Sequence, residues 1–174
     1  CEVSFGEAVS YDAIRMAIEN ELTFDDFCSF NIFSNGEVSA SNRATFTGNL
    51  AFGEIGLLNV GAYAQLNGNL ALNNSFMSIS GAAMSHDAAT LSISGSVSGD
   101  AVTITLTDTS SLSTDTVYYL ASGDWTNTEV TLDLNDSPYL TPTVTKKDGG
   151  HLFVSFQTTE GSYVWDGIQG KDTW

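Results

Sequence analysis

Gly48-Asn49-Leu50-Ala51-Phe52 returns twenty residues later as Gly68-Asn69-Leu70-Ala71-Leu72. The same spacing relates Leu57–Ala62 to Met77–Ala82, and Ser78-Ile79-Ser80-Gly81 reappears at Ser92-Ile93-Ser94-Gly95. Short apolar strand segments therefore recur about every ten residues between Ala44 and Leu106, separated by glycine and asparagine breaks. A fixed period of this kind is typical of stacked β-architectures.

Two all-β arrangements compete for this repeat region, a parallel β-solenoid and an antiparallel β-sandwich. No helix-forming run follows residue 23, which argues against an α/β sheet with crossover helices. Only a solenoid gives matching motifs a reason to repeat, so we expect solenoid rungs over residues 36–116. This fold places Leu50 beside Leu70 and Val60 beside Ile79, one inter-strand spacing apart.

The N-terminal segment, residues 1–35, is expected to cap the rungs. Apolar residues recur at helical spacing, with Ser10 as N-cap, and predict one helix over 11–22. The aromatic cluster that follows it is typical of a core beneath a cap.

Residues 117–174 are expected to form a β-rich C-terminal cap and the start of a next unit, within the same structural domain. Val130, Leu132 and Leu134 alternate with polar residues and should share one face of a strand. Asp148-Gly149-Gly150 predicts a hairpin, so the cap is expected to be antiparallel. Pro138 and Pro142 favour an edge position for the residues between them.

The charge and the cysteines limit the partners and the compartment. The 174-residue chain has 21 Asp and Glu against 5 Lys and Arg, a net charge of −16, which excludes nucleic acid as a reasonable partner. No run of eighteen apolar residues exists that could span a membrane. The two cysteines, Cys1 and Cys28, are either a disulfide of an exported protein or unrelated thiols, and a lipid-bearing first cysteine is a minor third option. The low lysine content and abundant small polar residues favour export and the disulfide.

Three motifs resemble the passenger region of bacterial autotransporter-type surface proteins: Tyr118–Gly123, Gly150–Phe156 and Tyr163–Gly167. Asp172-Thr173-Trp174 extends the last of them, and the resemblance covers roughly residues 44–174. It implies a right-handed β-helix, export to the cell surface or the extracellular space of a bacterium, and a role in adhesion or as a structural stalk. It also implies host or bacterial surface glycans or proteins as partners. Three features depart from this family: no membrane barrel is expected within residues 1–174, cysteines are unusual in such proteins, and residues 1–35 match nothing in the family.

No catalytic, metal or cofactor motif stands out in the sequence. The two histidines, His86 and His151, are not paired at metal-ligand spacing, and no G-x-S-x-G motif occurs. The candidate binding residues are aromatic side chains that could stack on sugars, Trp125, Tyr139, Trp165 and Tyr118, although packing within the cap explains each of them as well. The sequence thus favours a non-enzymatic module. The alternative is a carbohydrate-binding or polysaccharide-cleaving domain on the same scaffold.

Overall fold

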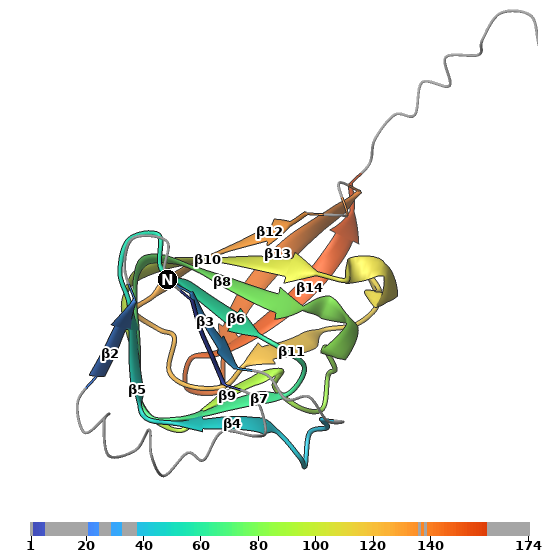
Figure 1. Cartoon of the computed structure of the whole chain (residues 1–174). Coiled ribbons are helices and arrows are strands. Elements are labelled where there is room, and N and C mark those ends of the chain that lie inside the picture. Colours follow the sequence, from blue (N-terminus) through green and yellow to red (C-terminus); the bar gives the residue numbers. More distant parts are fainter. Residues whose placement is uncertain are drawn as a thin grey trace, which may run out of the picture.

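The computed structural model describes residues 2–5, 21–24, 29–32, 38–135, 137 and 139–159. Within these residues the chain is all-β, and its only helical elements are two short 3-10 helices at Gly81–Ala83 and Thr109–Ser111. Two sheets, here called the large sheet and the small sheet, enclose one hydrophobic core (Figure 1).

The large sheet is built of parallel pairs in the order β1-β3-β6-β8-β10-β12, and β2 and β5 join it through β8. Its strands are β1 (Glu2–Phe5), β2 (Glu21–Phe24), β3 (Ser29–Ile32), β5 (Asn49–Phe52), β6 (Leu57–Val60), β8 (Leu70–Ser80), β10 (Val97–Thr107) and β12 (Glu129–Leu134).

The small sheet has the order β13-β14-β11-β9-β7-β4 and mixes two pairing modes. Its strands are β4 (Ala44–Thr47), β7 (Ala64–Asn67), β9 (Leu91–Ile93), β11 (Tyr118–Ala121), β13 (Leu140–Lys147) and β14 (His151–Thr158). The first four pair in parallel, whereas β14 is antiparallel to both β11 and β13. From β6 to β12 consecutive strands of the chain alternate between the two sheets.

The large sheet bends, because its two longest strands each turn within their length. β8 turns at Asn74, whose φ is 54°, and β10 turns at Gly99, whose φ is 111°. A Cβ on Gly99 would overlap the backbone of Leu72, so only glycine fits where these strands approach. β5 consequently lies along a side of its own, between the strands β4, β7, β9 and the strands β3, β6, β8 (Figure 1).

The register confirms the two pairings that the sequence predicts. Leu50 lies beside Leu70 and Val60 beside Ile79, both in parallel strands. The parallel pairs of both sheets exclude an antiparallel sandwich. They also extend outside residues 36–116, because β1 and β3 pair before this region and β12 pairs with β10 after it.

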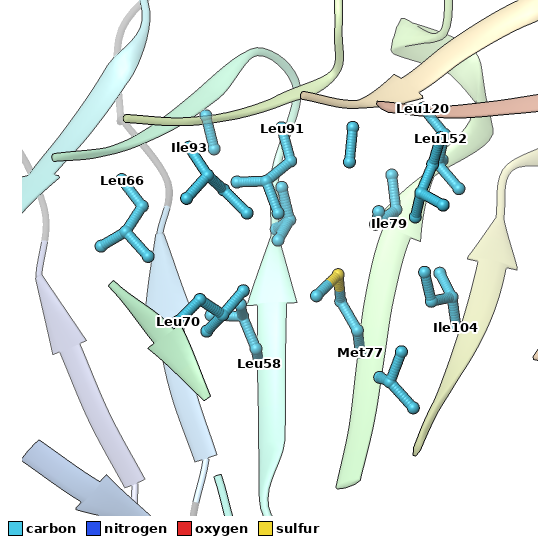
Figure 2. Packing of buried hydrophobic residues seen from close by; sticks show 14 of the residues in the cluster. Leu58, Leu66, Leu70, Met77, Ile79, Leu91, Ile93, Ile104, Leu120 and Leu152 are labelled. Atoms are coloured by element: carbon cyan, nitrogen blue, oxygen red, sulfur yellow. The ribbon is translucent and has the colours of Figure 1, made fainter. Parts of the chain in front are cut away.

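The core consists of inward side chains stacked in columns along the parallel register. Leu58 lies beside Met77, which in turn lies beside Ile104, and all three are fully buried. Figure 2 shows these residues of the large sheet facing those of the small sheet, which include Leu66, Leu91, Ile93, Leu120 and Leu152. Burying each leucine or isoleucine stabilises the fold by about 1.5–3 kcal/mol.

Glycine and asparagine repeat at one corner, just before β5, β8 and β10, because the chain makes the same contact there each time. A Cβ on Gly68 would overlap the carbonyl oxygen of Gly48, so the two segments stack at this corner only without a side chain. The backbone N–H of Asn69 donates to Oδ1 of Asn49 (2.8 Å), and Oδ1 of Asn69 accepts from the backbone N–H of Ser96 (2.9 Å). These side chains satisfy backbone groups that the strand ladder leaves unpaired.

The number of residues between stacked corner positions increases after the first repeat. The corner bond between Asn69 and Asn49 spans twenty residues, whereas that between Ser96 and Asn69 spans 27. The added residues lie between β8 and β9, where the chain forms the 3-10 helix Gly81–Ala83 and a turn. Ser92-Ile93 therefore stacks on Gln65-Leu66, and its resemblance to residues 78–81 does not reflect equivalent positions.

The two ends of the chain depart differently from expectation. Positions 11–20 of the predicted helix lie outside the described residues, but its end is wrong, because Leu22 belongs to β2 and pairs with Leu50. Cys1 and Cys28 also lie outside the described residues. At the other end the hairpin prediction is confirmed: β13 and β14 are antiparallel, and β13, which contains Pro142, is the edge strand.

Candidate binding surface

An open groove of about 490 Å³ crosses the outer face of the large sheet. This volume falls in the range of ordinary ligand pockets. The groove is lined by residues of the turn before β6, of strands β3, β6, β8 and β10, and of the residue after β12: Ser29, Ile55, Leu57, Asn59, Phe76, Ser78, Thr105, Thr107 and Asn135.

Strand alternation produces this lining. Met77 and Ile79 point into the core, so Phe76 and Ser78 point outward. The parallel register then places Ser78 between Asn59 and Thr105 on neighbouring strands. Columns of side chains therefore run across the strands, and the groove follows them.

Phe76 is the aromatic residue of the groove, and 41% of its surface is exposed. Among the described residues it stacks on no other ring, whereas Phe30 and Phe46 pack edge to face in the core. Burying its exposed area against a ligand would be favourable.

The backbone beside Phe76 is held in an unusual conformation at Ile55. Ile55 has a φ of 67°, in the left-handed region that β-branched residues rarely adopt. It lies in a turn in which the N–H of Gly56 donates to the carbonyl oxygen of Gly53 (3.0 Å), and the N–H of Phe76 donates to the carbonyl oxygen of Gly56 (2.8 Å). Strain of this kind persists only where the surroundings hold it, and such positions cluster at functional sites.

The polar groups of the groove are neutral amides and hydroxyls. Nδ2 of Asn59 donates to Oδ1 of Asn31 (2.6 Å), which fixes the orientation of the Asn59 amide. None of the described residues that line the groove is charged, although the chain has a net charge of −16. Within the described part of its lining, the groove offers one ring, two aliphatic side chains and several neutral hydrogen-bonding groups.

A second aromatic group, the ring cluster, lies on the small sheet and consists of Tyr119, Phe153 and His151. Tyr119 is stacked on Phe153 with ring centroids 4.6 Å apart, and on His151 at 5.6 Å. The hydroxyl of Tyr119 is also hydrogen-bonded to Nδ1 of His151. Nζ of Lys147 lies 5.7 Å from the Phe153 centroid. Because these ring faces already have partners, the cluster fastens β14 to β11 and offers little stacking surface to a ligand.

Electrostatics supports this structural role. Burial raises the pKa of Tyr119, the negative charge of Asp148 adds to the effect, and Arg43 opposes it. Burial lowers the pKa of Arg43. Nη1 of Arg43 donates to the carbonyl oxygen of Ala89 (2.8 Å), and its guanidinium lies 5.6 Å from the Tyr63 centroid. The guanidinium of Arg43 is thus already bound by groups of the protein itself.

The four predicted binding residues do not form one site in the structure. Trp125 is fully buried, and its Nε1 donates to the carbonyl oxygen of Ser122 (2.9 Å), so packing accounts for this ring and leaves no face on which a sugar could stack. Tyr118 is 6% exposed and packs edge to face on Phe156. Tyr139 is 50% exposed and lies outside both the groove and the ring cluster. Trp165 lies outside the described residues.

The groove was not among the predicted sites, and strand alternation was the signal that could have revealed it. In Phe76-Met77-Ser78-Ile79 the phenylalanine is out of phase with the two core residues. Nothing local marked Ile55, whose conformation follows from the turn that joins β5 to β6.

The described residues contain no group of three or more His, Cys, Asp or Glu that could hold a metal ion. His86 forms an exposed ion pair with Asp87, with Nε2 and Oδ1 2.9 Å apart. No helix in the described part of the chain is long and apolar enough to cross a membrane.

Comparison of the whole chain with known protein families, curated proteins and solved structures found no match.

Proposed function

We propose that the chain is an exported, non-enzymatic β-solenoid module of a bacterial cell surface that acts in adhesion or as a structural stalk. The proposal includes the right-handed β-helix that the resemblance to autotransporter passengers implies. The observation on which it rests is the continuous parallel stack from β3 to β12, with a binding groove on its side wall.

The stacking pattern favours a solenoid. Inward columns such as Leu50 beside Leu70, and the shared corner at Gly48 and Gly68, are the contacts that successive coils make. The antiparallel hairpin of β13 and β14 follows the last parallel strands. Such a hairpin can end a stack and protect its edge.

The groove favours binding over cleavage. Hydrolysis of a glycosidic bond needs two carboxylates that face each other across the substrate. Among the described residues that line the groove none is a carboxylate. A surface of this composition can hold a ligand but offers no acid or base to act on it. The alternative of a carbohydrate-cleaving domain is therefore disfavoured at this site, while carbohydrate binding fits it.

Adhesion can be tested with beads coated with the folded protein. The beads are placed on bacterial lawns, cultured host cells and glycan-coated glass, and their retention under flow is counted. We expect retention on at least one surface and none for beads coated with heat-unfolded protein. If folded protein holds beads no better than albumin on every surface, the adhesion proposal is wrong.

The same protein should be assayed for release of reducing sugar from a polysaccharide panel. We expect no release. Cleavage that is abolished by replacing one or two carboxylates would replace the proposal with its enzymatic alternative.

A further inference from the structure

We propose that the groove on the large sheet binds a neutral, linear oligosaccharide whose chain runs across the strands and whose sugar ring packs on Phe76. This inference rests on the proposed function and names the ligand class of its adhesive site.

The shape of the groove argues for an elongated ligand. Its lining residues come from β3, β6, β8, β10 and the residue after β12, which are successive neighbours in the sheet. Four inter-strand spacings span about 19 Å. A single sugar would fill only part of this length, whereas a linear chain of several sugars can follow it.

The charge of the groove argues for a neutral ligand. The lining residues that the structure describes are uncharged, and the chain as a whole has a net charge of −16. The surrounding field repels uronates, sulfated sugars and acidic peptides. A cationic ligand would find no carboxylate among these described lining residues with which to pair.

The chemistry of the lining suits sugars in particular. A pyranose has an apolar face of C–H bonds and a rim of hydroxyl groups. The C–H face can pack on the exposed ring of Phe76, whose face is electron-rich. Neutral amides and hydroxyls such as those of Asn59 and Thr105 can donate to and accept from the rim, and Asn59 is already oriented by Asn31.

The strained turn gives the inference an independent test. Ile55 lines the groove although its left-handed backbone would be relaxed by glycine. If this isoleucine is present for binding, Ile55→Gly should raise the melting temperature and weaken ligand binding. If Ile55 had only a structural role, Ile55→Gly would not raise the melting temperature and at the same time weaken ligand binding.

The experiment is a calorimetric titration with neutral oligosaccharides of glucose, mannose, xylose and N-acetylglucosamine, each from disaccharide to hexasaccharide. Oligogalacturonate serves as the anionic comparison. We expect one neutral series to bind, with affinity that increases with chain length. Phe76→Ala should weaken binding about tenfold, and Phe76→Trp should retain it. Tyr139→Ala is the matched control, because it removes an exposed ring outside the groove and should leave the affinity unchanged.

Three outcomes of the titration would overturn the inference: no neutral series binds, the anionic series binds best, or Phe76→Ala binds as tightly as the unaltered protein. Concentration-dependent self-association that Phe76→Ala abolishes would also overturn it, since a second copy would then occupy the groove. The bead assay separates the two proposals. Beads that are retained equally with and without Phe76 leave adhesion standing and refute only the groove.

Discussion

Substitutions at two adjacent positions, Leu70 and Asn69, test the stack itself. Leu70 is fully buried between Leu50 and Val97 in the parallel register. Leu70→Ala removes core contacts and leaves a cavity, which costs about 3 kcal/mol within the usual range of 2–5. For a chain of this size each kcal/mol lowers the melting temperature by about 2–4 °C, so we expect a decrease of roughly 6–12 °C.

Leu70→Asp adds an unpaired buried carboxylate, which costs several kcal/mol more. The sum approaches the total stability of an ordinary domain, about 5–15 kcal/mol, so the repeat region should be unfolded at room temperature. Asn69→Asp is the matched control. Its carboxylate keeps the acceptor for the N–H and Oγ of Ser96, so its cost should be below about 1 kcal/mol.

Circular dichroism during heating gives the melting temperature of all three variants. Amide hydrogen exchange then shows which strands lose protection. The neighbouring strands β5 and β10 should lose protection together with β8, because they share the column. A decrease of less than about 2 °C in the melting temperature of Leu70→Ala would refute the buried column at Leu70. An Asn69→Asp variant as unstable as Leu70→Asp would refute it as well.

The remaining predictions concern the corner, the ring cluster and the cysteines. Gly68→Ala should lower the melting temperature by several degrees, because its Cβ would overlap the carbonyl oxygen of Gly48, and an unchanged transition would contradict the corner contact. Because folding raises the pKa of Tyr119 above its ordinary 10.0, its contribution to stability is complete below about pH 10 and is lost as the pH rises through the folded value. Denaturant titrations in alkaline buffers should show a shallower loss for Tyr119→Phe, and equal slopes would count against this. A disulfide between Cys1 and Cys28 would close a loop of about 28 residues worth roughly 3–4 kcal/mol. Mass spectrometry without reductant should find the chain lighter by two protons, whereas two free thiols in protein made in an oxidising compartment would dismiss the bridge.

The parallel register could be predicted because its causes are local and repeated. Leucines at fixed spacing must share an inward column, and the Gly-Asn pairs mark the corner between them. Leu50 and Leu70 therefore lie where the sequence places them. The lengthening of the period could not be predicted, since Ser92-Ile93 resembles Ser78-Ile79 as closely as a true repeat would. Short segments that alternate serine with isoleucine suit either sheet.

The binding surface was harder to predict than the fold. Trp125 was a candidate for sugar stacking, yet its backbone N–H donates to the carbonyl oxygen of Gly150 (3.1 Å), a residue of the hairpin that folds back over it. That contact joins distant parts of the chain, and no local pattern reveals it. The exposure of Phe76 was readable from alternation, but the groove around it depends on five neighbouring strands at once.

The segment between β8 and β9 tolerates changes in length that the glycine corner does not. It absorbs the added residues of the longer period while the strands on both sides keep their pairing. Its tip, at His86 and Asp87, is exposed and bonded mainly to itself. A foreign peptide inserted there would be displayed on the outside without shifting the paired strands on either side of it.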